Sequence, residues 1–191
     1  DFTPHDGANA AGASETESHG EEEALAALAI AAERRLRDFN PQAVANTAWA
    51  FATVNYRDEQ PFAALAIAAE RRLREFNAQH LANSAWALAT VNYRDEKLFA
   101  ALARVAERRL THFNPQDVAN TAWAFATVNC RDEKLFAALA RAAERLLSEF
   151  KPQELANTAW AFATVNLIKR AGKDVWGEWL TIARGMVRDR D

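Results

Sequence analysis

Several residue types that carry out chemistry or form cross-links are scarce in this chain of 191 residues. A single cysteine, Cys130, excludes an internal disulfide and any cysteine-based zinc site. Four scattered histidines without a repeated carboxylate partner give neither a metal site nor a catalytic triad, and the six glycines form no phosphate-binding loop. No apolar run is long enough to span a bilayer. We therefore expect a protein that is not an enzyme and that uses no cofactor, metal, small-molecule substrate or membrane contact.

The chain begins at Asp1, and its only methionine is Met186. We therefore expect a fragment or a processed product, with any targeting segment outside the sequence. Cys130 occupies the position that Tyr56 and Tyr93 hold in similar segments. A buried or half-buried filler is expected there, with a reactive thiol as the alternative.

The net charge of −3 hides an uneven distribution of acidic residues. Residues 1–23 carry seven acids and neither lysine nor arginine. The remainder of the chain has 19 acidic against 23 basic residues and a charge of +4. A mildly basic body behind an acidic leader is compatible with an RNA-binding surface but does not require one.

One segment of sixteen residues recurs along the chain. NPQDVANTAWAFATVN at 114–129 returns almost unchanged at 40–55, 77–92 and 151–166, and its tryptophans are spaced by 37 residues. The segments between these copies repeat as well. Self-similarity at a fixed period of this length is typical of stacked helical repeats. The sequence therefore predicts an all-α fold, a right-handed α-solenoid of four 37-residue helix pairs.

Each repeat is predicted to contain two helices. The first, best seen over 96–112, follows the good N-cap Asp95 and gathers its apolar side chains on one arc. The second starts with Asn114 and Pro115, is apolar nearly all round and is expected to lie mostly buried between its neighbours. Asparagine tolerates the left-handed conformation that often follows a helix. The second helices are therefore expected to end near Asn55, Asn92, Asn129 and Asn166.

The ends of the chain differ from its repeats. Residues 1–20 are small, polar and without periodicity, so a disordered acidic leader or linker is predicted there. The four repeats are assigned to residues 21–166. After residue 166 the period is lost although a helical pattern continues, and 167–191 is interpreted as a divergent capping helix.

A polar stripe on each second helix is the first candidate site. Uncharged donors and acceptors along one face, one set per repeat, are what RNA readers of one base per repeat present. The alternative is a ladder of hydrogen bonds between adjacent second helices. The stripe consists of Gln42, Asn46, Thr53, Gln79, Asn83, Thr90, Gln116, Asn120, Thr127, Gln153, Asn157 and Thr164.

Basic residues on the first helices of repeats 3 and 4 are the second candidate. They could contact phosphates, although a solvated helix face is the alternative reading. These residues are Lys97, Arg104, Arg108, Lys134, Arg141 and Arg145.

The four repeated tryptophans are assigned to the core. They lie at the edge of the polar stripe, but their small alanine neighbours suit close helix packing. Stacking on RNA bases is the alternative. The residues are Trp49, Trp86, Trp123 and Trp160.

The 37-residue repeat, which contains the sequence FNPQDVANTAWAFATVNYRDEKLFAALA, resembles the heptatricopeptide repeat over roughly residues 23–166. That family is related to the octotricopeptide and FAST-kinase-like leucine-rich helical repeats of organellar RNA-binding proteins. The resemblance implies an α-solenoid that binds single-stranded RNA in mitochondria or chloroplasts. It further implies a role in RNA processing, transcript stability or ribosomal RNA metabolism. Many such proteins carry a RAP domain, which this sequence does not show.

The expected function is therefore a non-catalytic RNA-binding module of organellar RNA processing. A protein–protein interaction scaffold is the alternative, because a solenoid binds whatever its concave surface suits.

Overall fold

The computed structural model of the chain describes residues 4–56 and 58–165 and is all-helical over these ranges, with no strand among them. This confirms the predicted all-α class. Helix and 3₁₀ boundaries recur at intervals of 37 residues from α3 onward. The elements are α1 Pro4–Arg35, α2 Pro41–Thr53, α3 Glu59–Arg72, η1 Leu73–Glu75, α4 Ala78–Thr90, α5 Glu96–Arg109, η2 Leu110–His112, α6 Pro115–Thr127, α7 Glu133–Leu146, η3 Leu147–Glu149 and α8 Pro152–Thr164.

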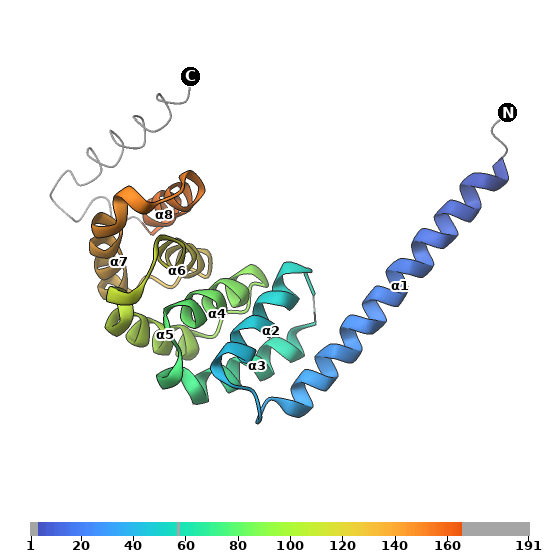
Figure 1. The fold of residues 1–191 in the computed structure, drawn as a ribbon, viewed down its shortest axis with the longest axis horizontal. Coiled ribbons are helices and arrows are strands. Elements are labelled where there is room, and N and C mark those ends of the chain that lie inside the picture. Colours follow the sequence, from blue (N-terminus) through green and yellow to red (C-terminus); the bar gives the residue numbers. More distant parts are fainter. Residues whose placement is uncertain (1–3, 57, 166–191) are drawn as a thin grey trace, which may run out of the picture.

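The helices form two rows that follow a curve (Figure 1). Helices α2, α4, α6 and α8 pack successively against one another, and we name them the inner row because they lie on the inside of the curve. Helices α1, α3, α5 and α7 form the outer row, which is also joined successively. Helices α2, α4 and α6 each also contact the outer helix that follows them, α3, α5 and α7 respectively.

The helix ends have the predicted caps. Asp95 accepts hydrogen bonds from the backbone N–H groups of Lys97 and Leu98 at 2.9 and 3.0 Å, and Asn114 accepts one from Asp117 N–H at 2.8 Å. After the inner helices the chain turns through left-handed residues, with φ of 56°, 58° and 59° at Asn55, Asn92 and Asn129. The predicted turn at Asn166 lies outside the described residues.

The core lies between the two rows. Leu98, Leu102 and Phe113 of the predicted apolar arc are buried, as that arc requires. Phe99 of α5 meets Phe125 of α6 edge to face with ring centroids 5.1 Å apart, and Phe136 repeats the contact with Phe162 at 5.5 Å. Such aromatic pairs add roughly 0.5–1.5 kcal/mol to the burial of their area. The rows are therefore joined by a recurring phenylalanine contact.

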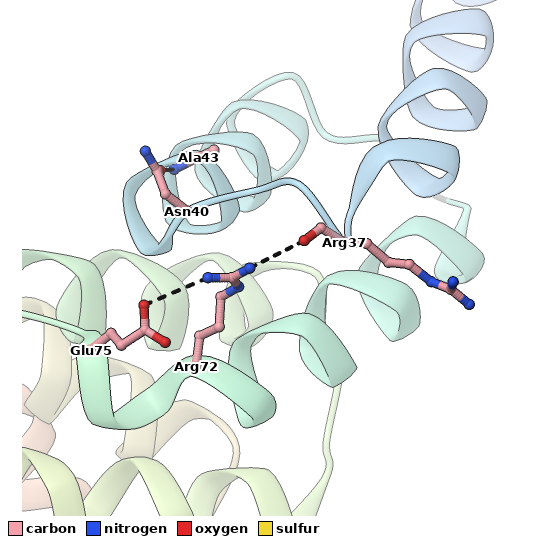
Figure 2. A network of polar contacts seen from close by, with 5 residues as sticks. All are labelled: Arg37, Asn40, Ala43, Arg72 and Glu75. Carbon is pink, nitrogen blue, oxygen red and sulfur yellow. Dashed lines mark hydrogen bonds and ion pairs between the residues drawn. The ribbon is translucent and has the colours of Figure 1, made fainter.

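Arginines of the outer row tie each helix pair to the preceding one. Arg72 Nη2 donates to the backbone oxygen of Arg37 at 3.1 Å, and its Nη1 lies 3.6 Å from the Glu75 carboxylate (Figure 2). Arg109 donates in the same way to the oxygen of Arg74 at 2.7 Å. These carbonyls lie at the ends of outer-row helices, where backbone acceptors lack partners within the helix. The guanidinium groups thus act as braces between neighbouring helix pairs.

The two chain ends relate differently to the predictions. In the structure residues 4–20 continue α1, where the sequence predicts a leader or linker without periodic structure. Four alanines in that segment favour a helix once the periodic part of α1 has begun it. The predicted capping helix at 167–191 lies outside the described residues, and the division into three domains stays a prediction. Of the helices that the structure describes, none is long and apolar enough to cross a membrane.

Candidate nucleic-acid interface

The twelve polar candidates come together on one side of the inner row. Helices α4 and α6 are flanked by inner-row neighbours on two sides and by outer-row helices on a third, so one side remains open. In α2, Asn46, Trp49 and Thr53 follow Gln42 at steps of four, seven and eleven residues, which places all four on one face of the helix. We name this open side, with its four sets of Gln, Asn, Trp and Thr, the inner face.

The glutamines and asparagines of the inner face are available for a ligand. All four glutamines are exposed; Asn46 is exposed as well, and the other three asparagines are half-buried. Within residues 4–56 and 58–165 none of the four asparagine side chains is hydrogen-bonded to its neighbours. The structure therefore does not contain the amide ladder considered as an alternative. Its absence leaves the amides free to pair with bases.

The threonines of the inner face are partly used by their own helices. Thr53 donates to the backbone oxygen of Trp49 at 2.8 Å, and Thr90 donates to that of Trp86 at 2.9 Å. This bond to the carbonyl one turn earlier is a local interaction typical of helical threonine. The hydroxyl oxygens of Thr53 and Thr90 can still accept a hydrogen bond, but their protons are already engaged. The hydroxyl oxygen of Thr127 is buried and has no hydrogen-bond partner within the described residues.

The tryptophans lie on the inner face, and their assignment to the core is wrong for the first and the last of them. Trp49 and Trp160 are 46% and 48% exposed. Trp86 and Trp123 are half-buried, and their ring centroids lie 6.3 Å apart with the planes inclined by 34°. The spacing of tryptophan relative to Asn and Thr, three and four residues along the helix, puts it on the polar stripe. Alanines such as Ala45 fill the contacts between inner helices instead.

The six basic candidates lie elsewhere. Lys97, Arg104 and Arg108 project from α5 and the equivalent three residues from α7, so they belong to the outer row and are all exposed. Arg104 donates to Ala100 O of its own helix at 3.2 Å. Leu146 occupies the repeat position that Arg72 and Arg109 hold in the earlier repeats. The preceding residue, Arg145, replaces them and donates to the backbone oxygen of Leu110 at 3.0 Å. The structure therefore does not bring the basic and amide candidates together.

Two arginines that the sequence reasoning missed lie at the border of the inner face. Arg94 and Arg131 follow the left-handed asparagines that end α4 and α6. Their Nε atoms donate to the Oδ1 atoms of Asn92 and Asn129 at 2.8 and 2.9 Å, and both side chains are exposed. The sequence signal was their recurrence at 57, 94 and 131, with the 37-residue period. These guanidinium groups can meet phosphates of a strand that lies along the inner face.

A buried acid marks the opposite end of the inner helices. Asp117 accepts from Asn114 N–H at 3.1 Å and is 4% exposed. Burial raises the pKa of this carboxyl, and the hydrogen bond from Asn114 opposes the rise. It borders a pocket of about 310 Å³ between the starts of α4 and α6, lined also by Gln79 and Arg109. The arrangement caps the start of α6.

Among the described residues no group of histidine, cysteine, aspartate and glutamate is placed to hold a metal ion. Cys130 is half-buried, as predicted for a filler in the tyrosine position. Burial raises the pKa of its thiol, and the nearby acids Asp132 and Glu96 raise it further, which disfavours the reactive thiolate.

The inner face thus offers amides, aromatic faces and bordering guanidinium groups in four similar sets, a combination suited to the bases and backbone of a single nucleic-acid strand. Residues 21–179 match the protein family described as RESC6, RNA-editing substrate-binding complex 6 protein. No curated protein matches the chain.

Proposed function

Because the chain belongs to the family of RNA-editing substrate-binding complex 6 proteins, we propose that it is a non-catalytic RNA-binding module that acts in RNA processing. The description of the family refers to the binding of RNA-editing substrates, which points to RNA, and to a complex. Membership in this family also supports the mitochondrion as the compartment, rather than the chloroplast that the repeat resemblance also allows.

One observation carries the proposal. The four sets of Gln, Asn, Trp and Thr lie on the open inner face, and the asparagines there make no hydrogen bonds to one another within the described residues. A half-buried amide without a protein partner is stabilised when a base edge pairs with it. Base stacking on the exposed rings of Trp49 and Trp160 adds about 1–3 kcal/mol for each base.

The Trp86–Trp123 pair behaves differently from the two outer tryptophans. A base sandwiched between two rings needs about 7 Å between them, because each stacked contact takes about 3.5 Å. The centroids of Trp86 and Trp123 are 6.3 Å apart, so these rings are nearly in contact with each other. Bases therefore stack on Trp49 and Trp160, and between these two positions a base meets the amides of Asn83 and Asn120.

The proposed fold that supports this face is a right-handed α-solenoid of four helix pairs. Two successive rows, recurring boundaries and recurring Phe and Arg contacts are the features that support it. That the repeats are of the heptatricopeptide type stays a prediction from the sequence of the repeat. A protein scaffold is the second candidate, since the family description places its members in a complex.

The test measures affinity for fluorescently labelled single-stranded RNA by anisotropy. One variant carries both Asn83→Ala and Asn120→Ala, which lie on the inner face. Its affinity is compared with that of Gln60→Ala on α3. The expected result for the double variant is a loss of at least about tenfold, or ~1.4 kcal/mol. Gln79→Ala and Gln60→Ala form a matched pair, because both residues are exposed glutamines in the first turn of a helix. Equal RNA affinity of Gln79→Ala and Gln60→Ala would contradict binding at the inner face. A wild-type chain that binds no RNA at low salt would favour the protein scaffold.

The near identity of the four sets adds a prediction about the target. Identical donors and acceptors read identical bases, so a homopolymeric run is expected to bind better than a mixed sequence of equal length. Asn120→Asp exchanges an amide donor for an acceptor and is expected to change the base tolerated at one position. Equal affinity for all four homopolymers and a mixed strand would leave contacts to the RNA backbone alone.

A further inference from the structure

A pocket of about 310 Å³ lies between the starts of α4 and α6. It is lined by Gln79 and Asp117 of these two helices, by Arg109 at the end of α5 and by His112 of η2, among others. Because Gln79 is also one of the four glutamines of the inner face, the pocket adjoins the surface proposed to bind RNA. Its volume lies at the lower end of the range of about 300–1,000 Å³ that small-ligand pockets occupy, so it suits one nucleobase and not a longer segment.

The repeats differ from one another at this pocket. Proline begins the other three inner helices, whereas Ala78 begins α4 and lines the pocket. An acid stands at each repeat equivalent of His112, namely Asp38, Glu75 and Glu149. The repeats are otherwise nearly identical, so these two departures give the place between α4 and α6 a chemistry that the other helix pairs lack.

The histidine in place of an acid changes the surroundings of the neighbouring arginine. In the preceding repeat the carboxylate of Glu75 lies 3.6 Å from Nη1 of Arg72, the equivalent of Arg109. Arg109 has the imidazole of His112 at that position of the sequence instead. Its Nη2 donates to the backbone oxygen of Arg74 at 2.7 Å, and a guanidinium carries further N–H donors. The pocket therefore contains a cationic donor that is not matched by the acid of the earlier repeats.

Asp117 contributes a buried acceptor to the same pocket. It is 4% exposed, and its Oδ2 accepts from Asn114 N–H at 3.1 Å. Within the described residues its Oδ1 accepts no hydrogen bond. At the equivalent position of α8, Glu154 caps its helix through the same bond from Lys151 N–H at 2.9 Å but is only half-buried, so capping does not require burial. A buried carboxylate oxygen without a donor costs free energy, which a ligand with N–H groups recovers.

We propose that this pocket receives one guanine base of the RNA that lies along the inner face, with Asp117 accepting from the base and Arg109 donating to it. This inference rests on the proposed function. Guanine presents two adjacent donors, N1–H and the N2 amino group, to a carboxylate, and its O6 and N7 are acceptors that fit a guanidinium. Uracil has a carbonyl oxygen on each side of its single N–H, and a carboxylate repels both. An unstacked base of a single strand turns into such a pocket at small cost.

A single guanine pocket gives the bound strand a fixed register. Four nearly identical sets of side chains bind a homopolymer equally well in several registers, because a shift by one repeat exchanges like for like. The pocket between α4 and α6 has no equal in the chain, since Ala78 and His112 each occur once at their repeat positions. The strand bound best is therefore a run of one base interrupted by one guanine.

The test compares RNA strands by fluorescence anisotropy with the whole chain. A short oligouridine is measured beside the same strand with one internal guanosine, adenosine or cytidine. Guanosine is expected to raise the affinity about tenfold, within the discrimination that one good bidentate contact provides, and adenosine and cytidine are expected to raise it less. Inosine, which lacks the N2 amino donor, is expected to lose part of the gain.

Substitutions at the pocket identify the group that recognises the base. Asp117→Asn replaces an acceptor by an amide donor and can still accept from Asn114 N–H through its remaining oxygen. This variant is expected to bind the guanosine strand no better than oligouridine. Glu154→Gln makes the same exchange at the equivalent position of α8 and is the matched control, which is expected to keep the preference for guanosine. His112→Glu restores the acid of the other repeats beside Arg109 and is expected to reduce the preference, should Asp117→Asn lower the helix content in circular dichroism.

Four results would overturn the proposal. Equal affinity of the wild type for all four strands would remove the guanine pocket but leave RNA binding at the inner face. A stronger gain with adenosine or cytidine would mean that the pocket takes another base. A guanosine preference that survives both Asp117→Asn and His112→Glu would place its recognition elsewhere. Absence of binding to every strand would overturn the proposed function together with this inference.

Discussion

Leucine at one repeat position provides a test of the packing in two environments. Leu102 of α5 is 1% exposed, and Leu28, its equivalent in α1, is 60% exposed. Replacing a fully buried leucine by alanine removes its transfer free energy and leaves a cavity, at a cost of about 2–5 kcal/mol. The same change at an exposed position usually stays within about 0.5 kcal/mol. We expect Leu102→Ala to lower the free energy of unfolding by ~3 kcal/mol and Leu28→Ala hardly to change it.

The assay is thermal and urea unfolding followed by circular dichroism, at concentrations where the chain is monomeric. For a protein of this size 1 kcal/mol shifts Tm by about 2–4 °C, so Leu102→Ala is expected to lower Tm by roughly 6–12 °C. Leu28→Ala provides the control with identical chemistry. Equal losses in the two variants at low concentration would refute the packing described here.

Further predictions concern single side chains. Arg109→Met removes the hydrogen bond to Arg74 O and is expected to cost about 1 kcal/mol in urea unfolding, whereas the exposed neighbour Arg108→Met changes little; equal effects would argue against a brace. The raised pKa of Asp117 means that the folded chain binds its proton more tightly than the unfolded chain does, so the stability that this group contributes falls as pH rises above the ordinary value of 3.8. Asp117→Asn is expected to remove that decrease in a pH series of urea unfolding, and an unchanged profile would contradict it. Replacing Arg94 and Arg131 by glutamine is expected to reduce the salt dependence of RNA affinity by roughly 0.7 in slope for each phosphate that is no longer neutralised, and an unchanged slope would exclude them as phosphate ligands.

Local sequence signals predicted most of the helical architecture. Caps such as Asp95 and Asn114, the apolar arc of α5 and the left-handed asparagines depend on residues within a few positions of each other. Even Asn77, which lacks the following proline, caps α4 by accepting from His80 N–H at 2.8 Å. Helix α5 ends at Arg109, and a 3₁₀ turn continues to His112. The predicted end at residue 112 is therefore the end of this 3₁₀ turn and not of the α-helix.

The tryptophans show where local signals fail. An inner helix is apolar nearly all round, and its sequence does not say which side remains open after packing. The small alanine neighbours of Trp49 and its equivalents favoured a place in the core, but alanines such as Ala45 themselves fill the contacts between inner helices. Trp49 and Trp160 are therefore left exposed on the open side.

The arginines show that local sequence signals also do not predict contacts between residues far apart in the chain. Arg109 reaches a carbonyl 35 residues earlier, and Arg145 takes over that role where Leu146 replaces the usual arginine. Such contacts depend on how helix pairs are placed in space. The sequence pattern places Lys97 and Asn120 on different helices of a repeat, but it does not show which of these helices lies on the inside of the curve.

Photo-crosslinking tests the central claim, that RNA bases bind along the inner face, most directly. A single-stranded RNA substituted with 4-thiouridine is bound to the whole chain, irradiated, and mapped by mass spectrometry of the crosslinked peptides. We predict crosslinks within 40–55, 77–92, 114–129 and 151–166, the segments that contain the inner helices, and their reduction after Asn83→Ala with Asn120→Ala. Crosslinks confined to 96–109 and 133–146, where the basic candidates of the outer row lie, would contradict the account.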